Sequence, residues 1–315
     1  MLSAIQHDSR QSVSEIAAKV RMRHHSVVYA LKELEERRII RPYLLTNPHV
    51  LGLTDYCVFF NYIGEEKSAR KKIIDFCVKS QQVAYFAELS GPYQYSVSLF
   101  CHTIFEVTGF FSKLAALLPR SSFECSFALR LEFTQFLGKW ADPKATPIIL
   151  DRARVAREVS IDEIDRKIIG FYSQHAELPL KSVAEFAGVS ESTVRNRLLS
   201  LEKNKVIHSF AYVVDVNKIG ITTFRIILCA KGLEQSFRTK MYKYMVNHPR
   251  SSAFVHCAGA WDFELNFDLE DSSEMGGIIE DVSDHFGANI RQMHSVSEIA
   301  VHRAHHFPLD AGLLA

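Results

Sequence analysis

The feature that most constrains the fold of this 315-residue chain is an internal repeat. Three apolar residues spaced for one face of a helix recur at a constant offset (194 − 27 = 198 − 31 = 201 − 34 = 167): Val27, Leu31 and Leu34 match Val194, Leu198 and Leu201. Gly91 and Gly259 continue the repeat at an offset of 168. A chain with such self-similarity is expected to build one structural unit twice.

Residues 190–207 of the second copy predict a helix with one exposed polar face. Ser190 is suited to cap it, because its hydroxyl can accept hydrogen bonds from the free amides of the first turn. A shorter apolar helix over 183–187 precedes it, and Gly188 lies between the two. This order is typical of a helix-turn-helix. A plain pair of packed helices with solvated arginines would show much of the same pattern.

A second kind of domain follows each helical unit. Its pattern predicts the order strand-helix-strand-strand-helix-strand, that of a ferredoxin-like sandwich with one antiparallel sheet under two helices. We therefore expect an α+β chain of two repeats, each a winged-type helix-turn-helix head followed by a ferredoxin-like βαββαβ domain. The expected boundaries are 1–45 (first head), 53–137 (first sandwich), 138–159 (linker), 160–210 (second head), 221–304 (second sandwich) and 305–315 (tail).

The linker between the copies contains Pro143 and Pro147, and a helix is one possible structure for its second half. After it, Ser160 and Glu163 have the spacing of a capping box, which predicts that a helix begins after Ser160.

Charge and cysteine content set few limits on function. Residues 1–45 hold eight Lys/Arg against five Asp/Glu, whereas residues 155–209 hold eight of each, so only the first head has a modest positive excess. The six cysteines show no metal-ligand spacing and lie in apolar runs, which is typical of buried free thiols. With no signal peptide and no long apolar run, we expect a cytoplasmic protein.

The chain resembles the leucine-responsive/asparagine-synthetase regulator (Lrp/AsnC) family of transcription factors, with two whole family units fused in tandem. Three segments carry the resemblance: 161–168 (IDEIDRKI), 188–198 (GVSESTVRNRL) and 259–262 (GAWD). The resemblance implies a DNA-binding head and a sandwich domain that pairs with another copy and binds amino acids or related small molecules.

The first copy departs from this pattern at four places. Arg23 replaces the capping serine, Arg21 stands where the second copy has Gly188, Gln94 stands where it has Asp262, and the first helix is short at its start. If both heads bind DNA, the two heads are therefore expected to prefer different base sequences.

Exposed polar residues of the two predicted recognition helices are the candidates for DNA contact. Arginine can bind guanine and asparagine can bind adenine in the major groove, while flanking Arg and Ser can hold phosphates. The candidates are Ser192, Arg195, Asn196 and Arg197 in the second copy, and Arg21, Arg23, His25, Tyr29 and Lys32 in the first.

The turn in the middle of each sandwich domain is the candidate effector site. A glycine lets backbone amides approach a ligand carboxylate, an aromatic side chain supplies an apolar wall, and an aspartate could pair with an ammonium group. A strand connection with a core aromatic explains the same residues. The candidates are Gly259, Ala260, Trp261, Asp262, Gly91, Tyr93 and Gln94.

We find no catalytic triad, paired carboxylates or phosphate loop, so the sequence predicts no enzyme and no cofactor. The C-terminal histidines are better explained as solvated side chains than as metal ligands. Two alternatives stay open: a sirohaem decarboxylase on the same architecture, and a sensor that acts by protein contact without DNA. The decarboxylase should carry basic residues in the strand after the sandwich glycine, where only His102 is found.

The fusion also predicts the assembly. The tether favours pairing of the two sandwich domains within one chain, a pseudo-dimer that recognises an asymmetric operator, with further self-association of chains.

Overall fold

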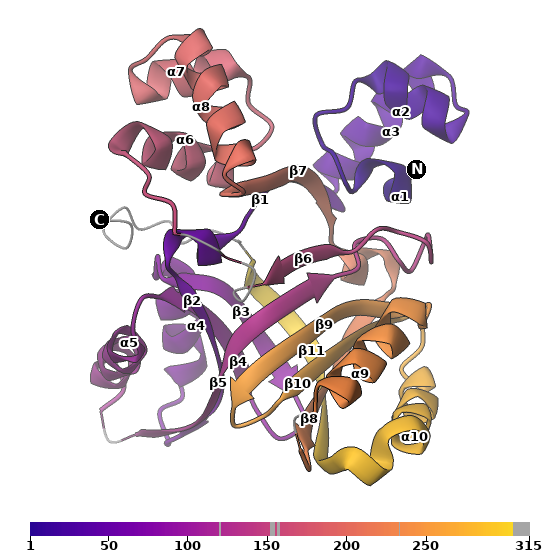
Figure 1. Ribbon diagram of the computed structural model, residues 1–315. Coiled ribbons are helices and arrows are strands. Elements are labelled where there is room, and N and C mark those ends of the chain that lie inside the picture. The colour runs from indigo at the N-terminus through magenta and orange to yellow at the C-terminus, as the bar shows by residue number, and fades with distance from the viewer. Residues whose placement is uncertain (120, 152–154, 156–157, 233, 305–315) are drawn as a thin grey trace.

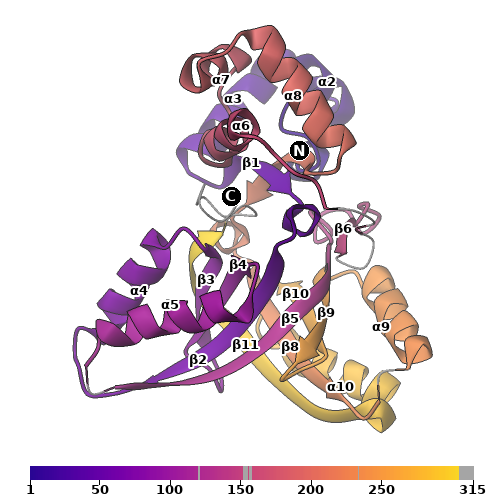
Figure 2. The same cartoon turned by 60° about the vertical axis from the view of Figure 1, so that its left-hand side comes forward.

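The computed structural model describes residues 1–119, 121–151, 155, 158–232 and 234–304, and it confirms the predicted fold class. Each half is a helix-turn-helix head followed by the strand-helix-strand-strand-helix-strand order of the ferredoxin-like fold. The two heads lie next to each other above one shared sheet (Figures 1 and 2).

The helices and strands alternate in the same order in both copies. The first copy comprises α1 (Leu2–Ile5), α2 (Val13–Val20), α3 (His24–Glu36), β1 (Ile40–Thr46), η1 (Pro48–Leu51), β2 (Thr54–Ile63), α4 (Ala69–Lys79), β3 (Val83–Ser90), β4 (Tyr95–Cys101), α5 (Ile104–Ala116) and β5 (Ser122–Gln135). Strand β6 (Ile148–Asp151) lies between the copies. The second copy comprises α6 (Glu163–Gln174), α7 (Leu180–Ala187), α8 (Glu191–Lys203), β7 (Ile207–Val214), η3 (Val216–Ile219), β8 (Thr222–Ala230), α9 (Gln235–Asn247), β9 (Ser251–Gly259), β10 (Phe263–Leu269), α10 (Glu274–Phe286), η4 (Gly287–Asn289) and β11 (Ile290–Ala304).

Eight antiparallel strands from the two copies close into one ring. The order is β2-β4-β3-β11-β8-β10-β9-β5, and β5 pairs back with β2. The two long strands join the halves, because β5 pairs with β2 and then β9, while β11 pairs with β8 and then β3. The two sandwich domains therefore share one barrel, whose interior is lined by both copies.

Helices cover the outside of this barrel. Helices α4 and α5 lie over the strands of the first copy and α9 and α10 over those of the second (Figure 2). An apolar core fills the space under each helix pair, one around Phe86 and Phe110 and one around Phe254 and Phe263. The inside of the barrel holds a third apolar cluster around Phe59 and Trp261.

Strands β1 and β7 form a separate two-stranded ribbon between the heads and the barrel (Figure 1). Tyr43 pairs with Ala211 at its centre, and these residues correspond in the repeat (211 − 43 = 168). Each strand also packs into the opposite head: Leu44 of the first copy lies in the core of the second head, and Tyr212 of the second copy lies in the core of the first. The ribbon thus fixes the two heads relative to each other.

Within the second head, the inward face of α8 is as predicted, because Val194, Leu198 and Leu201 are all buried. The start of α6 differs from the prediction. Asp162 is the N-cap instead of Ser160, and its side chain accepts a hydrogen bond from the Asp165 amide. Because the helix begins after Asp162, Ile161 stays in extended chain and is buried in the core of the head.

The linker also differs from the prediction, because its second half begins with a strand and not a helix. Strand β6 pairs with the edge of β5, and its apolar residues Ile148 and Leu150 are buried beside Tyr43 and Leu45 of the ribbon. These side chains gain burial only in an extended segment that alternates between two faces. Residues 152–154 and 156–157 lie outside the described residues.

Candidate nucleic-acid interface and ligand cavity

Helix α8 presents three of its four predicted DNA contacts to solvent. Ser190 caps the helix by accepting a hydrogen bond from the Thr193 amide at 3.1 Å. On the same helix, Ser192, Arg195 and Asn196 are exposed. They lie opposite the buried apolar face, where a DNA groove could approach them.

Arg197 is placed differently from the other three. Its Nη1 lies 2.7 Å from Asp162 Oδ2 and 3.4 Å from Asp165 Oδ2. A hydrogen bond from the backbone of Asp165 and the Arg197 guanidinium lower the pKa of Asp162, whereas burial raises the pKa of Asp165. Arg197 therefore ties α8 to the start of α6, and this contact depends on tertiary packing that the helix pattern does not reveal.

The first head leaves its predicted contacts exposed as well. Arg21, Arg23, His25, Tyr29 and Lys32 all lie on the surface, and the Tyr29 side chain is 69% exposed. Lys32 forms an exposed ion pair with Glu36 at 3.7 Å. Arg23 caps α3 without a side-chain hydrogen bond, as its side chain has no acceptor.

In the second copy, the predicted effector turn is built into the barrel. Trp261 is fully buried and donates its indole N–H to Glu264 at 3.2 Å, and Asp262 accepts the Ala230 amide at 2.7 Å. Gly259 has a φ of +147° and no room for a side chain, since a Cβ would lie 2.6 Å from the carbonyl oxygen of Phe127. Ala260 donates its amide to the same oxygen.

The turn of the first copy is held in the same way. Gly91 has a φ of +103°, and a Cβ there would lie 2.9 Å from the Ser295 carbonyl oxygen. Tyr93 stacks on Phe59 inside the barrel, and the Gln94 side chain accepts the Tyr62 amide at 2.9 Å. In both turns these groups contact other parts of the barrel, and ligand binding by them stays a prediction.

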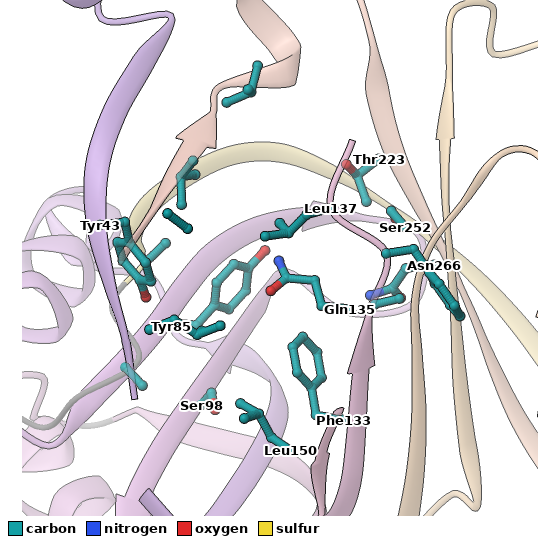
Figure 3. A pocket seen from close by; sticks show the side chains of 18 of the residues that line it. Tyr43, Tyr85, Ser98, Phe133, Gln135, Leu137, Leu150, Thr223, Ser252 and Asn266 are labelled. Atoms are coloured by element: carbon teal, nitrogen blue, oxygen red, sulfur yellow. The ribbon is translucent and has the colours of Figure 1, made fainter. Parts of the chain in front are cut away.

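A cavity of about 260 Å³ lies at the other end of the barrel, under the β1–β7 ribbon (Figure 3). None of the seven turn residues lines it. Its roof comes from the ribbon and from the chain after β5, including Tyr43, Leu137 and Leu150, and its floor comes from the barrel strands. The lining combines residues of both copies.

Charged side chains form a buried network at the floor of this cavity. Arg130 contacts Glu264 at 2.9 Å and Asp55 at 3.5 Å. Arg225 contacts Glu298 at 2.9 Å and Glu264 at 3.4 Å. Burial alone would raise the pKa of Glu264, but the two guanidinium groups lower it.

One ion pair of this network, Arg130–Glu264, joins the two copies, whereas Arg130–Asp55 lies within the first copy and the contacts of Arg225 lie within the second. At the offset of 168, Arg225 corresponds to Cys57, Glu264 to Ser96, Glu298 to Arg130 and Asp268 to Phe100. The repeat therefore preserves the backbone but not the interior charges, and each copy supplies groups that the other lacks.

The sequence analysis missed the cavity residues, although a signal was present. In β10 the polar residues Glu264, Asn266 and Asp268 alternate with buried apolar residues that pack under α9 and α10. Three polar side chains in a row on the second face of a strand, all buried, indicate a polar interior site.

Two of the C-terminal histidines contact polar side chains of the chain. His302 contacts Glu88 at 2.9 Å and His294 contacts Gln292, whereas His305 and His306 lie outside the described residues. Within the described part of the chain, no cluster of three or more His, Cys, Asp or Glu side chains could hold a metal ion.

In that same part, no helix is long and apolar enough to cross a membrane.

Comparison with known proteins confirms the resemblance to the Lrp/AsnC family. Residues 161–202 match the model of the AsnC-type helix-turn-helix domain. The HTH-type transcriptional regulator FL11 of Pyrococcus furiosus is 26% identical over 145 residues, which cover 45% of this chain and 92% of FL11. The HTH-type transcriptional regulator AldR of Mycobacterium tuberculosis is 26% identical over 126 residues, 39% of this chain and 69% of AldR.

A solved structure matches the whole chain. The crystal structure of the siroheme decarboxylase NirDL superposes with a TM-score of 0.64 and 12% sequence identity, covering 99% of this chain and 94% of NirDL. At this identity the likeness shows the fold, including its two-unit arrangement.

This match overturns the prediction that the chain is not an enzyme, because an enzyme has the same whole-chain architecture. The argument behind that prediction fails too. A decarboxylase was expected to carry basic residues in the strand after the sandwich glycine, yet the cavity receives Arg41, Arg130 and Arg225 from β1, β5 and β8.

Proposed function

From its AsnC-type helix-turn-helix and its relationship to Lrp/AsnC regulators, we propose that this chain is a DNA-binding transcriptional regulator that responds to a small molecule. The observation that carries the proposal is the exposed polar face of α8, within the segment that matches the AsnC-type domain. The cavity directly under the ribbon that holds both heads supports the second part.

In this proposal Arg195 and Asn196 contact base edges and Ser192 contacts phosphate. Guanidinium and amide groups can form bidentate hydrogen bonds with guanine and adenine, and hydroxyl groups suit phosphate oxygens. Arg197 is assigned a different role, because its ion pairs with Asp162 and Asp165 hold α8 against α6.

The first head contributes a different surface to the same complex. Its exposed residues Arg23, His25, Tyr29 and Lys32 differ in chemistry from those of α8. Because the ribbon fixes the two heads together, both should contact one DNA duplex at unlike half-sites. The selected operator should therefore be asymmetric.

A small effector in the cavity would touch the ribbon directly. Tyr43 and Leu45 of β1 and Val213 of β7 line the cavity, and the same strands supply Leu44 and Tyr212 to the cores of the heads. An effector that favours one position of the ribbon would shift the relative position of the heads. The cavity is large enough for an amino acid or a related small molecule, whereas the polar groups of the two turns already contact other parts of the barrel.

The DNA contacts are tested by measuring fluorescence anisotropy on operators selected from genomic fragments. Arg195→Ala/Asn196→Ala should weaken binding by at least tenfold, since each base contact is worth about 1–3 kcal/mol. Lys167→Ala on α6 is a matched control, because it also removes one positive charge from the same head. Equal affinity of the double variant and the wild type would reject α8 as the recognition helix.

A decarboxylase acting on a tetrapyrrole is the second candidate, favoured by the whole-chain match and by the arginines at the cavity. Two observations weigh against it. Arg130 and Arg225 are already paired with carboxylates, and about 260 Å³ lies below the 300–1,000 Å³ of ordinary ligand pockets. A new absorption band after incubation with sirohaem, followed by loss of carbon dioxide, would favour the enzyme.

A further inference from the structure

The polar end of the cavity is built by the second copy. Thr223 and Arg225 of β8 lie opposite Asp268 and Asn266 of β10 in the strand register, and Ser252 of β9 lines the same end. Figure 3 shows Thr223, Ser252 and Asn266 grouped on one side of the cavity. The corresponding end of the first copy lacks this acidic group, because Phe100 replaces Asp268.

This end offers buried acceptors on Asn266 and Asp268, and among the described residues Nε and Nη1 of Arg225 and Oγ of Ser252 also lack a hydrogen-bond partner there. Asn266 is 8% exposed, and its side-chain oxygen has no partner among the described residues. Asp268 is 7% exposed and accepts the Thr223 hydroxyl at 2.8 Å. A buried acceptor without a donor costs free energy, so a donor from a ligand would stabilise this arrangement.

The charges around the cavity also lack one cation. Three guanidinium groups line the cavity, Arg41, Arg130 and Arg225, and the carboxylates around it are Asp55, Glu264, Glu298 and Asp268, which leaves one negative charge (3 − 4 = −1). A protonated amine would balance this interior, whereas an anion would add to the uncompensated charge.

Apolar side chains line the other end of the cavity. Phe133, Leu137, Trp140 and Leu150 come from β5, β6 and the chain between them, whereas Phe136 lies beside Ser252, whose carbonyl oxygen accepts the Phe136 amide at 2.9 Å. A volume of about 260 Å³ equals roughly nine water molecules, or an organic molecule of about ten non-hydrogen atoms.

We infer that the cavity binds a small monoamine, whose ammonium group contacts Asp268 and Asn266 and whose apolar body lies against Leu137, Trp140 and Leu150. The inference deepens the proposed regulator by giving the chemistry of its effector. It also places the effector site in the cavity and not at the turn of Asp262, which lies outside the cavity.

Isothermal titration calorimetry on the full chain tests the inference with four amines: 2-phenylethylamine, cyclohexylamine, hexylamine and 3-methylbutylamine. At least one should bind, and the alcohol or acid of the same skeleton should bind at least tenfold more weakly. L-Phenylalanine is included because a zwitterion would reveal whether a carboxylate is also accepted. No heat from any of the four amines at millimolar concentration overturns the inference, as does equal binding of the alcohol.

Single substitutions test where on the chain the amine binds. Asp268→Asn and Asn266→Ala should each weaken the amine at least tenfold, and Leu150→Trp should block it by filling the apolar end. Asp262→Asn, which removes a carboxylate of the same copy at the turn, should leave the affinity unchanged. Loss of binding in Asp262→Asn with retention in Asp268→Asn would overturn the inference in favour of the turn.

The same proteins separate this inference from the regulator proposal. DNA binding by each variant, measured by anisotropy, reports that the chain is folded and that the heads are intact. Wild-type protein that binds operator but no amine would reject the monoamine alone. Wild-type protein that binds the amine but no DNA would reject the regulator alone.

Discussion

At the residue scale, Asp268 shows how burial sets the chemistry of the cavity. Burial raises the pKa of Asp268 to about 6, and the hydrogen bond from Thr223 offsets only part of that effect. The folded chain therefore holds this proton to higher pH than the unfolded chain, whose carboxyl has an ordinary pKa near 3.8. The linked stability is fully present below about pH 4 and is lost as the pH rises through about 6.

We predict that Asp268→Asn removes this pH dependence. The difference in the free energy of unfolding between variant and wild type should move in favour of the variant by up to about 3 kcal/mol between pH 4 and pH 7. Urea titrations at a series of pH values measure it. Parallel stability curves for the two proteins would show that Asp268 does not titrate abnormally.

Arg21 and Gly188 show a second residue-scale effect, in the turns of the two heads. Both adopt the left-handed conformation, with φ of 55° and 71°. This conformation costs a residue with a Cβ about 1 kcal/mol more than glycine. The sequence shows which copy has the glycine, but only the structure shows that Arg21 takes the same strained conformation.

We predict opposite stability changes at these two positions. Gly188→Ala should lower the free energy of unfolding by about 1 kcal/mol, purely through the backbone, because a Cβ there meets no atom within 4 Å. Arg21→Gly should raise it by up to about 1 kcal/mol. Thermal and urea unfolding of both variants measure the effects, and a change of the same sign in both would contradict the explanation.

At the element scale, the ribbon of β1 and β7 determines how the heads are held. The periodicity of the sequence predicted the helices of each head and the extended segments after them. It did not predict that each segment packs into the other head, because that contact depends on the antiparallel pairing of strands 167 residues apart. Long-range pairing leaves no local pattern, and the Arg197 ion pairs across α6 and α8 escaped notice for the same reason.

The exchange of strands predicts cross-effects between the heads. Leu44→Ala, in the first copy, should destabilise the second head by about 2–5 kcal/mol and speed amide exchange in α6–α8. Tyr212→Ala, in the second copy, should do the same for α1–α3 and also remove the hydrogen bond to Glu35. Hydrogen exchange read by mass spectrometry gives the result for each helix.

Leu31→Ala is the control, because this half-buried residue of α3 packs in its own head. It should affect α1–α3 only. Faster exchange confined to the copy that carries the substitution, for both Leu44→Ala and Tyr212→Ala, would mean that the ribbon does not join the heads in solution.

At the scale of the whole molecule, the repeat was enough to predict two sandwich domains but not the interior that they share. The offset of 168 aligns the strands, and the aligned positions hold Arg130 against Glu298 and Cys57 against Arg225. Such differences look like ordinary divergence until the barrel closes and brings Arg130 next to Glu264 of the other copy. The cavity escaped prediction because its polar residues come from strands far apart in the sequence.

The interior charges predict which copies pair. In a barrel of two second copies, two Arg225 groups would face four carboxylates from Glu264 and Glu298, whereas the observed barrel places two guanidinium groups against three carboxylates. A barrel of two first copies would set two Arg130 against two Asp55, so pairing of like copies concentrates two uncompensated charges in one barrel, whereas unlike copies leave one in each. Arg130→Met and Glu264→Met should each destabilise the chain, and the double variant should be about 1–3 kcal/mol more stable than the sum of the two effects predicts.

Native mass spectrometry at nanomolar concentration should give the 35.8 kDa mass of one folded chain. Additive effects would show that Arg130 and Glu264 never meet, as when each copy pairs with its own counterpart in a second chain. A coupled pair in a species of twice that mass would instead mean that the barrel forms between chains.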